Sequence, residues 1–568
     1  MGDVNISSIV EHLRKHGYEA DCSSNTILTN HCVNGKCYQI EGTFENNFPF
    51  ELPKLYLLDR RSFGSIAHVG WDNKYNKGII CEGVSVNRHI DFSRPEIVYL
   101  KALEKAVATV NTGLESEESN ANEIEKEFTA HWKFATENDN TSIISFVEPS
   151  DKIKLIENFT KNNTTFFTDS STNIINDKYG YKKENRNKSQ TIGKAFYFPI
   201  NQNVLPPNPN TVIIEWWKNV LTILPELQKN QLKDIARKNK AKTIWILGSI
   251  NIGDGQHGWF CIKFQSKVKL NAPFDNDQDL YLWSVTPFYV KLHYKEYLKP
   301  RGGATVNSNH KITIVGCGSV GAEIARQLVC SGIDNLDLVD YDELTTDNIY
   351  RHYLSSQHIG SLKSSALAHD LAIKYPYVNI QASNKRKYLK DCLDAGYLNS
   401  VTGFIVATGS PTDERFFNEK LFNLEKKPWV VYVWVEGYGV GGHSIYVHSK
   451  GNGCLNCLYR DRYGNKSLEA IQNFLKAEQE IAIDLSGCGS HFLPYSCIDS
   501  IQTAILGARL ALLAMNNELD HSCRISWKSS NNKSLTLETS YRYNNFNNNL
   551  IVENFSWDGC DVCNPKIK

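Results

Sequence analysis

Residues 311–344 read KITIVGCGSVGAEIARQLVCSGIDNLDLVDYDEL, and this stretch decides the fold of the C-terminal half of the chain. An apolar run ending in glycines, an apolar-periodic segment and a second apolar run predict strand, helix and strand. Further on, SLKSSALAHDLAIKY (361–375) predicts another helix and VTGFIVATGS (401–410) a later strand. Continuous apolar strands between helices are typical of a parallel sheet covered on both faces. We therefore expect a doubly wound, Rossmann-like α/β domain.

Three glycines between the first strand and helix, Gly316, Gly318 and Gly321, form a G-x-G-x-x-G motif. The first two let the backbone turn tightly and approach a phosphate or ribose, and the third lets the helix pack closely on the strand. The helix N-terminus favours anionic oxygens. Taken alone, the motif is equally consistent with a nicotinamide or flavin enzyme.

Polar residues after the second strand favour a triphosphate over a redox dinucleotide. Asp340 and Asp342 lie at the end of that strand, where a carboxylate can accept hydrogen bonds from ribose hydroxyls, although Asp342 is explained equally well as a turn residue. Asn348, Arg351 and Lys363 follow at short range. Cationic side chains suit a triphosphate that loses pyrophosphate, because negative charge develops on its oxygens. The set as a whole predicts an ATP site.

Two C-x-x-C pairs, each beside a glycine, lie far apart in this half of the chain: Cys454 with Cys457, and Cys560 with Cys563. Four thiolates presented by two such turns suit a tetrahedral Zn²⁺ ion. We predict a closed, structural zinc site that fastens the C-terminal tail to the sheet. The alternative is two buried or redox-active pairs, but neither pair begins a thioredoxin-like helix.

Bulk properties exclude several classes of protein. The 568 residues are too many for one core. Because 62 basic residues balance 62 acidic ones, there is no electrostatic reason to expect nucleic acid or an anionic membrane as a partner. No apolar run of about 18 residues and no signal-like N-terminus is found. With 15 cysteines, the pattern predicts a cytoplasmic protein whose cysteines serve metal binding, catalysis or packing rather than disulfides.

Three domains are expected from the order of the patterns. Residues 1–140 predict an α+β domain, with a first helix, strand-like runs CYQIEGTF and FPFELPKLYLLD, and two closing helices. Residues 141–298 predict an α/β connecting domain without a chemical motif, and residues 299–568 the doubly wound domain.

The stretch from Gly316 to Ala368 resembles the signature of the family that includes ubiquitin-activating enzymes and the bacterial thiamine- and molybdopterin-pathway adenylyltransferases. The resemblance implies that Asp340, Asn348, Arg351 and Lys363 hold ATP, and that two adenylation domains pair as a homodimer. It also implies a zinc ion on the two C-x-x-C pairs, with a loop between them that crosses the active site.

One position departs from that family pattern. The family usually places a magnesium-binding aspartate just after a mid-sheet strand, whereas Ser410 stands there in this chain. Asp413 lies three residues further on. The Mg²⁺ ligand is therefore left open between these residues.

Cys488 is the preferred thioester-forming cysteine of this domain. It stands in a glycine-rich stretch, and CGSHFLP resembles the cysteine loop of ubiquitin-activating enzymes, which carries a proline a few residues on. A reactive thiolate needs exposure and a lowered pKa. Cys497 is the rival, because it is nearer a helix start whose dipole would stabilise a thiolate. Cys523 is a weaker candidate.

The N-terminal domain supplies a second candidate nucleophile. FPFELPKLYLLD (48–59) followed by NKYNKGIIC (73–81) resembles the ubiquitin-conjugating fold, with Cys81 as its nucleophile and Asn73 eight residues before it. An asparagine amide at that place could donate to the oxyanion that forms when an amine attacks the thioester. The alternative is that Cys81 is a buried cysteine at a strand end.

The residues before Asn73 depart from the conjugating pattern. The expected His-Pro reads Trp71-Asp72, and His68 lies three residues before Trp71. Either the loop is longer and His68 takes the place of the family's histidine, or Asn73 matches by chance.

A chain with conjugating-like, connecting and activating-like parts resembles the fusion proteins of bacterial cyclic-oligonucleotide anti-phage (CBASS) operons. The resemblance implies adenylation of a partner's C-terminal carboxylate, the partner being a cGAS/DncV-like nucleotidyltransferase or a ubiquitin-like protein. Transfer to Cys488, transthiolation to Cys81 and amide formation on an acceptor protein would follow. The alternatives are a sulfur-carrier adenylyltransferase without conjugation and a nonenzymatic nucleotide-binding module.

Overall fold

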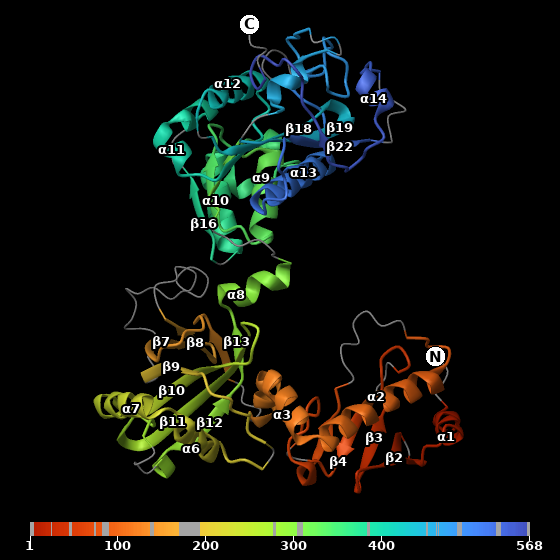
Figure 1. The fold of residues 1–568 in the computed structure, drawn as a ribbon, viewed down its shortest axis with the longest axis vertical. Coiled ribbons are helices and arrows are strands. Elements are labelled where there is room, and N and C mark those ends of the chain that lie inside the picture. The colour runs from red at the N-terminus through yellow and green to blue at the C-terminus, as the bar shows by residue number, and fades with distance from the viewer. Residues whose placement is uncertain are drawn as a thin grey trace. The chain divides into compact units, whose positions relative to one another are not determined.

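The fold is a mixed α/β structure built on three main sheets, as seen in the computed structural model (Figure 1). The described residues are 5–23, 25–44, 48–72, 75–81, 90–136, 141–169, 194–208, 210–275, 280–303, 310–375, 377–382, 387–425, 427–449, 452–461, 463, 465–484, 491–529 and 536–564. They divide into two compact units, one ending at Tyr294 and the other beginning at Lys295. The mixed α/β class expected from the sequence is confirmed.

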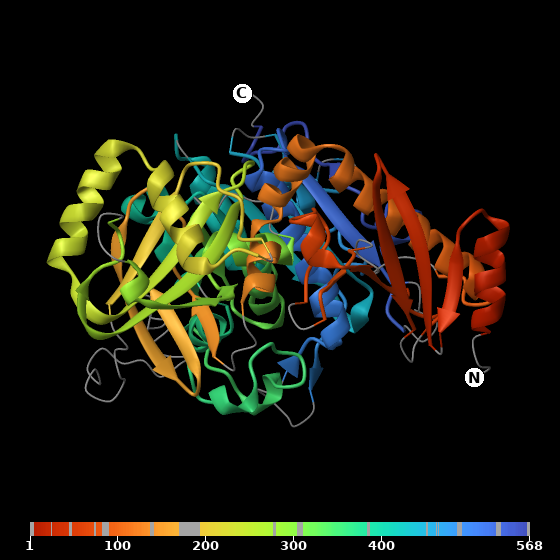
Figure 2. The same ribbon diagram turned by 90° about the horizontal axis from the view of Figure 1, so that it is seen from below.

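The first sheet is antiparallel, and its five strands lie in chain order. The strands are β1 (Ala20–Ser23), β2 (Thr26–Val33), β3 (Lys36–Thr43), β4 (Lys54–Leu58) and β5 (Lys77–Ile79). Helices α1 (Ile6–Lys15) and α2 (Pro95–Glu115) bury their apolar faces in the same core, and α1 lies beside β1 (Figure 2). Asn34 and Gly35 both have positive φ, as a two-residue hairpin between β2 and β3 requires.

A disulfide joins Cys32 and Cys37, which are paired across the β2–β3 hairpin with a Cα–Cα distance of 4.1 Å. This differs from the expectation that the cysteines avoid disulfides. The cause is register: the two-residue turn places the two cysteines directly opposite each other, a proximity that sequence spacing alone did not reveal.

The second sheet has eight strands in the order β12-β11-β10-β9-β7-β8-β6-β13. Their bounds are β6 Ser142–Ser145, β7 Lys154–Lys161, β8 Thr164–Thr168, β9 Lys194–Ile200, β10 Lys240–Asn251, β11 His257–Asn271, β12 Ser284–Phe288 and β13 Val290–Leu292. Helices α6 (Ile213–Ile223) and α7 (Glu226–Lys238) share a core with β9, β10 and β11. Phenylalanines and tryptophans form a large part of this core, and each buries a large apolar area.

Two short helices lead out of the first sheet, α3 (Glu117–Lys126) and α4 (Phe128–Ala135). Phe128 and Trp132 of α4 are fully buried in the core of the second sheet. The Trp132 indole N–H donates to the Phe288 carbonyl at 2.9 Å. The chain between the two sheets is therefore anchored by packing on the second sheet.

The third sheet has the order β16-β15-β14-β17-β18-β19-β22-β23, with parallel pairing from β16 to β18 and antiparallel pairing beyond. Its strands are β14 Ile312–Val315, β15 Asn335–Val339, β16 Asn379–Ala382, β17 Gly403–Val406, β18 Trp429–Val435, β19 Gly441–Val447, β22 Cys523–Lys528 and β23 Glu553–Asn554. The pair β20 (Ile483–Asp484) and β21 (His491–Phe492) is separate. β14 lies between β15 and β17, so the strand order reverses there.

Helices cover both faces of the third sheet. Residues of α9 (Ser319–Cys330), α10 (Lys363–Lys374) and α13 (Cys497–Met515) form one core with it. Residues of α11 (Ala395–Asn399) and α12 (Pro411–Phe422) form another. The remaining short helices of this unit are α8 (Lys295–Leu298) and α14 (Tyr541–Asn545). The expected doubly wound domain is thus confirmed.

In the described part of the chain, α13 alone is long and apolar enough to cross a membrane. Half of its most apolar window is buried, and its side chains pack against β18, β19 and α9. Its apolar character is accounted for by this core.

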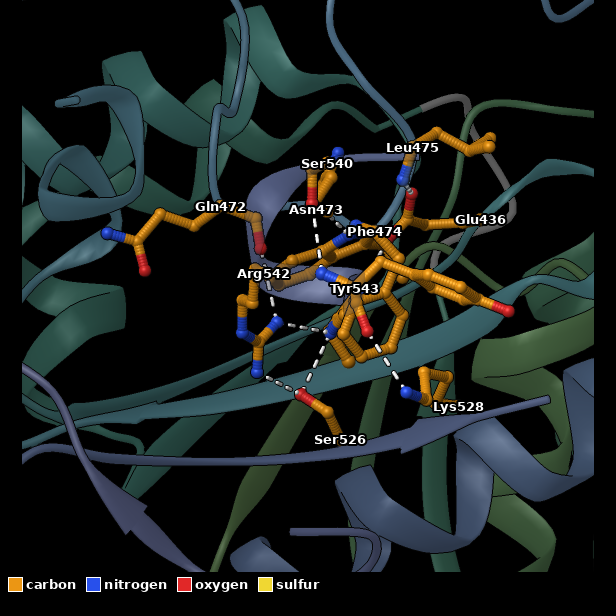
Figure 3. Close-up of polar contacts among 12 residues, drawn as sticks. Glu436, Gln472, Asn473, Phe474, Leu475, Ser526, Lys528, Ser540, Arg542 and Tyr543 are labelled. Carbon is orange, nitrogen blue, oxygen red and sulfur yellow. Dashed lines mark hydrogen bonds and ion pairs between the residues drawn. The ribbon is translucent and has the colours of Figure 1, made fainter. Parts of the chain in front are cut away.

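A buried carboxylate, Glu436, fastens the segment that follows the first C-x-x-C pair (Figure 3). Its two oxygens accept the backbone N–H groups of Phe474 at 2.5 Å and Leu475 at 2.8 Å. His443 Nε2 contacts the same carboxylate at 2.5 Å. Burial lowers the pKa of His443, although the neighbouring Glu436 opposes that shift. A chain segment without regular structure is therefore held to the sheet by buried polar bonds.

Arg542 fastens the segment near the C-terminus to the same place (Figure 3). Its guanidinium donates to the Gln472 carbonyl at 3.1 Å and to Ser526 Oγ at 2.9 Å. Lys528 donates to the Tyr543 carbonyl at 3.0 Å. Burial lowers the pKa of Arg542 to about 10. Segments 472–475 and 540–543 are thereby joined over one face of the sheet.

Replacing Glu436 with Gln should loosen the 472–475 segment. A glutamine has one acceptor oxygen, so one of the two amides at Phe474 and Leu475 loses its partner at a cost of about 1–3 kcal/mol. Hydrogen exchange of the peptide that contains these amides should accelerate by about tenfold or more. Glu538→Gln, which removes only an exposed ion pair to Lys476, should leave that exchange unchanged. Equal exchange in both variants would contradict the anchoring role of Glu436.

Candidate functional site

The glycine turn between β14 and α9 brings backbone into very close approach. Gly316 has φ +89°, and a Cβ there would lie 2.4 Å from the Ala407 carbonyl oxygen. A Cβ on Gly321 would lie 1.8 Å from the Gly316 carbonyl oxygen. Gly318 faces open space, where it lines a cavity. The first and third glycines therefore allow the turn to form, and the second leaves room for a ligand.

Asp340, at the end of β15, closes this turn from the neighbouring strand. Its carboxylate accepts the backbone N–H of Cys317 at 2.6 Å and that of Asp342 at 2.8 Å. Burial raises the pKa of Asp340 despite these two hydrogen bonds. The carboxylate therefore couples the glycine turn to the loop after β15, and it also lines the cavity.

The predicted cations lie at the same cavity, each with a contact that orients it. Lys363 is buried at the start of α10, and its Nζ lies 3.0 Å from Asp342 Oδ2. Arg351 donates to the Leu493 carbonyl at 3.1 Å, and its guanidinium lies 4.8 Å from the centre of the Tyr495 ring. Two positive charges are thus held above the glycine turn.

Asn348 is oriented locally. Its Oδ1 accepts the backbone N–H and the hydroxyl of Thr345, both at 3.2 Å, so its amide NH₂ remains available to a ligand. The structure brings all the residues expected to hold ATP, except Gly321, into the lining of one cavity of about 320 Å³; these are Gly316, Gly318, Asp340, Asp342, Asn348, Arg351 and Lys363. Gly321 acts behind the turn, through its close approach to Gly316.

Several lining residues were not anticipated from the sequence. His352 contacts the Cys317 carbonyl at 2.8 Å through Nε2. Tyr341 and Tyr388 stack with ring centres 4.8 Å apart at the rim, and Lys387 lies beside them in the lining. None of these residues belongs to a recognisable spacing pattern. Stacked aromatic faces are suited to a planar base.

The loop after β17 leads to the two candidate Mg²⁺ ligands, Ser410 and Asp413. Ser410 is the N-cap of α12, and its hydroxyl donates to Asp413 Oδ2 at 2.9 Å. Both residues line the cavity, so their oxygens fit a hard cation, which prefers oxygen ligands. Buried Glu414 accepts the Thr408 hydroxyl at 2.6 Å, and burial raises its pKa to about 7. Glu414 thereby fixes the loop that presents Ser410.

The four cysteines of the C-x-x-C pairs come together although the pairs lie more than 100 residues apart. Their sulfur atoms all lie within 4.8 Å of one another. Cys454 Sγ lies 3.8 Å from Cys560 Sγ, and Cys457 Sγ lies 3.6 Å from Cys563 Sγ. Tetrahedral zinc with Zn–S bonds of about 2.3 Å requires sulfurs about 3.8 Å apart. The donor set and its spacing therefore fit a zinc ion.

Two of the predicted reactive residues, Cys488 and Asn73, lie outside the described residues. The rival Cys497 is the first residue of α13 and is partly exposed, with Ser496 as N-cap. Cys523 is fully buried in β22, where burial raises the pKa of its thiol to about 12. That burial argues against Cys523 as a nucleophile.

Cys81 lies just beyond the end of β5 and is exposed. Its backbone N–H donates to the His68 carbonyl at 2.7 Å. The residue also lines a cavity of about 480 Å³ together with His68, Glu127, His131 and Phe134. The alternative of a buried cysteine at a strand end is therefore wrong.

Two family models match separate parts of the chain. The ThiF family model matches residues 299–547, which include the glycine turn and the cations. The model of prokaryotic E2 family B matches residues 11–140, which include Cys81.

The curated relatives are distant and partial. An ATP-dependent ubiquitin transferase-like protein Cap2 of Pseudomonas aeruginosa is 27% identical over 255 residues, covering 44% of this chain and 44% of the relative. A protein of the same name from Escherichia coli is 27% identical over 39% of this chain and 37% of its own length. A ubiquitin-like modifier-activating enzyme 5 of Drosophila persimilis is 34% identical over 18% of this chain and 26% of the relative. The matched stretch is thus less than half of each relative.

Among solved structures, E. coli MccB with ATP aligns at a TM-score of 0.30 and 16% identity, covering 45% of this chain and 67% of that chain. The resemblances expected from the two sets of motifs are confirmed by the family matches. The chain carries a ThiF family domain at residues 299–547 and a domain of prokaryotic E2 family B at residues 11–140.

Proposed function

We propose that this protein uses ATP to adenylate the C-terminal carboxylate of a partner protein and conjugates the activated acyl group to an acceptor. One observation carries the proposal: the glycine turn, the carboxylate of Asp340 and the cations Arg351 and Lys363 all face one cavity. Such a set binds a nucleotide and neutralises the charge that develops when an oxyanion attacks a phosphate. The ThiF family match supports this interpretation.

In the proposed first step the partner's carboxylate oxygen attacks the α-phosphorus of ATP, and pyrophosphate leaves. Arg351 and Lys363 stabilise the phosphate oxygens, Asn348 donates from its amide, and Asp340 accepts hydrogen bonds from the ribose. Mg²⁺ would be held by Asp413 and Ser410 and would supply further positive charge on the phosphates. The stacked tyrosines at the rim offer a surface for the adenine.

In the second step a cysteine of the ThiF domain displaces AMP and forms a thioester. We retain Cys488 for this role, with Cys497 as the alternative at the start of α13. Cys81 then takes the acyl group by transthiolation, and an acceptor amine finally forms an amide. The exposure of Cys81 and its place in a cavity of the E2 family domain support this assignment.

We further propose that the partner is a cGAS/DncV-like nucleotidyltransferase of an anti-phage operon rather than a free ubiquitin-like protein, and that its conjugation primes it. Support comes from the joint presence of the two family domains and from the Cap2 relatives. A cytoplasmic location and a homodimer paired through the ThiF domain complete the proposal.

Adenylation should depend on Lys363. In an ATP–pyrophosphate exchange assay with a cGAS/DncV-like nucleotidyltransferase as the partner, Lys363→Ala should lower the exchange rate by about 100-fold, because a charge at the reacting phosphate is lost. Lys374→Ala on the same helix removes a lysine that contacts Asp370 and the Tyr353 hydroxyl, none of which lines the cavity, and this variant should exchange like the wild type. Exchange that persists with a C-terminally amidated partner would overturn the assigned substrate.

Zinc should be present at one ion per chain and should support the C-terminal unit. Cys560→Ser should abolish stoichiometric zinc measured by mass spectrometry of the metal, and should lower the unfolding temperature by about 5 °C or more, because metal binding contributes folding free energy. Cys22→Ser, which changes an exposed cysteine in the other unit, should retain the zinc. Metal-free protein of unchanged stability would exclude the structural ion.

Conjugation should pass through Cys81. With ATP and the partner, Cys81→Ala should retain pyrophosphate exchange but lose the thiol-sensitive adduct found on the Cys81 peptide, because the acyl acceptor is gone. Cys81→Ser should instead trap an ester that survives thiol reductant. An adduct pattern identical to the wild type in both variants would favour a sulfur-carrier adenylyltransferase without conjugation.

A further inference from the structure

A histidine lies beside the exposed cysteine of the E2 family domain. His68 stands in the turn between the bridged residues Ile66 and Val69, and Val69 also bridges Ile80, the residue before Cys81. The Cys81 N–H donates to the His68 carbonyl at 2.7 Å. Both residues line one cavity of about 480 Å³, so they are neighbours that face the same space.

The backbone at His68 is held in a conformation that a histidine rarely adopts. Its φ is +60°, in the left-handed region that disfavours most side chains. The buried guanidinium of Arg60 donates to the carbonyls of Val69 at 3.2 Å and Gly70 at 3.0 Å. Burial lowers the pKa of Arg60 to about 10. An uncommon conformation imposed by a buried clamp is typical of functional sites.

A carboxylate orients the imidazole. Glu127, at the junction of α3 and α4, contacts His68 Nδ1 at 2.6 Å through Oε1. Its Oε2 accepts the His68 backbone N–H at 2.8 Å. Burial alone would raise the pKa of Glu127, but the bonds and charges of His131 and His68 outweigh it, so the pKa is lowered. Glu127 is therefore ionised, and it leaves Nε2 as the ring nitrogen of His68 that is free to act.

All three groups line one cavity of about 480 Å³, beside which the remaining titratable side chains are Glu51, Lys54 and His131. His131 is almost fully buried, with Nε2 3.7 Å from Glu127 Oε2. Its Nδ1 has no hydrogen-bond partner among the described residues. The site thus combines a nucleophile, an imidazole and a buried carboxylate in a space large enough for a side chain of another protein.

We propose that, in the transfer of an acyl group from Cys81 to a primary amine, Cys81 is the acyl carrier and leaving group, His68 is the general base, and Glu127 is the positioning residue. The proposal rests on the role proposed above for Cys81 as an acyl carrier. Its observational basis is the backbone hydrogen bond between Cys81 and His68, the cavity that both residues line, and the two contacts that Glu127 makes to His68. A base oriented by a carboxylate beside a nucleophile is the arrangement that activates acyl transfer.

The acceptor's amine nitrogen attacks the thioester carbonyl on Cys81, a C–N bond forms, and the C–S bond breaks. His68 Nε2 takes the proton that the nitrogen loses, and it returns this proton to the departing Cys81 sulfur. Glu127 stays ionised and stabilises the imidazolium that forms between the two transfers. In the resting chain, Cys81 Sγ has no hydrogen bond to another described residue, and such bonds commonly form only when substrate binds.

The test supplies the acyl group chemically, so it does not require the adenylation domain. The full chain is acetylated with phenyl thioacetate, and loss of acetyl from the Cys81 peptide to free lysine is followed by mass spectrometry. Acetyl on exposed Cys22 of the same chain reports the uncatalysed rate. His68→Ala should slow the discharge of Cys81 by about 100-fold, and added imidazole should restore part of the rate.

Two substitutions of Glu127 test whether its negative charge is required. Glu127→Gln should slow discharge by about tenfold, whereas Glu127→Asp, which keeps the carboxylate, should retain most of the rate. Glu123→Gln changes an exposed glutamate of the same helical segment that pairs with Lys126 and should behave like the wild type.

Two results would overturn the proposal. One is discharge from Cys81 in His68→Ala at the wild-type rate. The other is a slow discharge that imidazole does not accelerate, which would assign His68 a structural role only. Failure of ATP–pyrophosphate exchange would refute the adenylation proposal while leaving this outcome unaffected, so the two proposals can fail separately.

Discussion

The contact between Gly321 and the Gly316 carbonyl is the constraint on which the C-terminal unit depends. With no Cβ at Gly321, α9 begins immediately behind the end of β14, and Gly316 can turn at positive φ beneath Ala407. Asp340 then reaches the Cys317 N–H from the neighbouring strand. The cavity that gathers Arg351 and Lys363 exists because these three elements meet within hydrogen-bond distance. A side chain at either glycine would displace them all.

Long-range polar contacts, rather than regular secondary structure, hold several segments of the C-terminal unit in place. The segment after the first C-x-x-C pair is held by the buried carboxylate of Glu436, and the C-terminal segment by Arg542. The four cysteine sulfurs bring together the chain around Cys454 and the chain around Cys560. Because irregular backbone cannot satisfy its own polar groups, buried side chains supply the partners. The irregular segments between the cysteine pairs are held in this way, whereas β22 and β23 join the sheet itself.

In each of the two family domains, a carboxylate organises the loop beside a cavity. In the ThiF domain a buried carboxylate, Asp340, positions a glycine turn, and in the E2 family domain a partly buried carboxylate, Glu127, positions His68. In both cases a carboxylate that accepts backbone N–H groups fixes a loop beside a cavity. The energetic cost of burying each charge is offset by hydrogen bonds to it.

The sequence by itself determined the parallel sheet, the glycine turn and the two C-x-x-C pairs. The reason is that the periodicity of apolar residues and the short spacings within motifs reflect local backbone geometry. The residues from Gly316 to Lys363 that line one cavity could be predicted from the same stretch, since strand ends in a parallel sheet lie at one edge. The hairpin register that pairs Cys32 with Cys37 was not predictable in this way.

Only the tertiary structure decided which distant side chains meet. Glu127 lies 59 residues from His68, and Leu493 lies 142 residues from Arg351, yet each pair is in contact. Lys387 and Tyr388 reach the cavity from a loop without a motif. The physical reason is that such contacts depend on packing between elements, and packing leaves no fixed spacing in the chain.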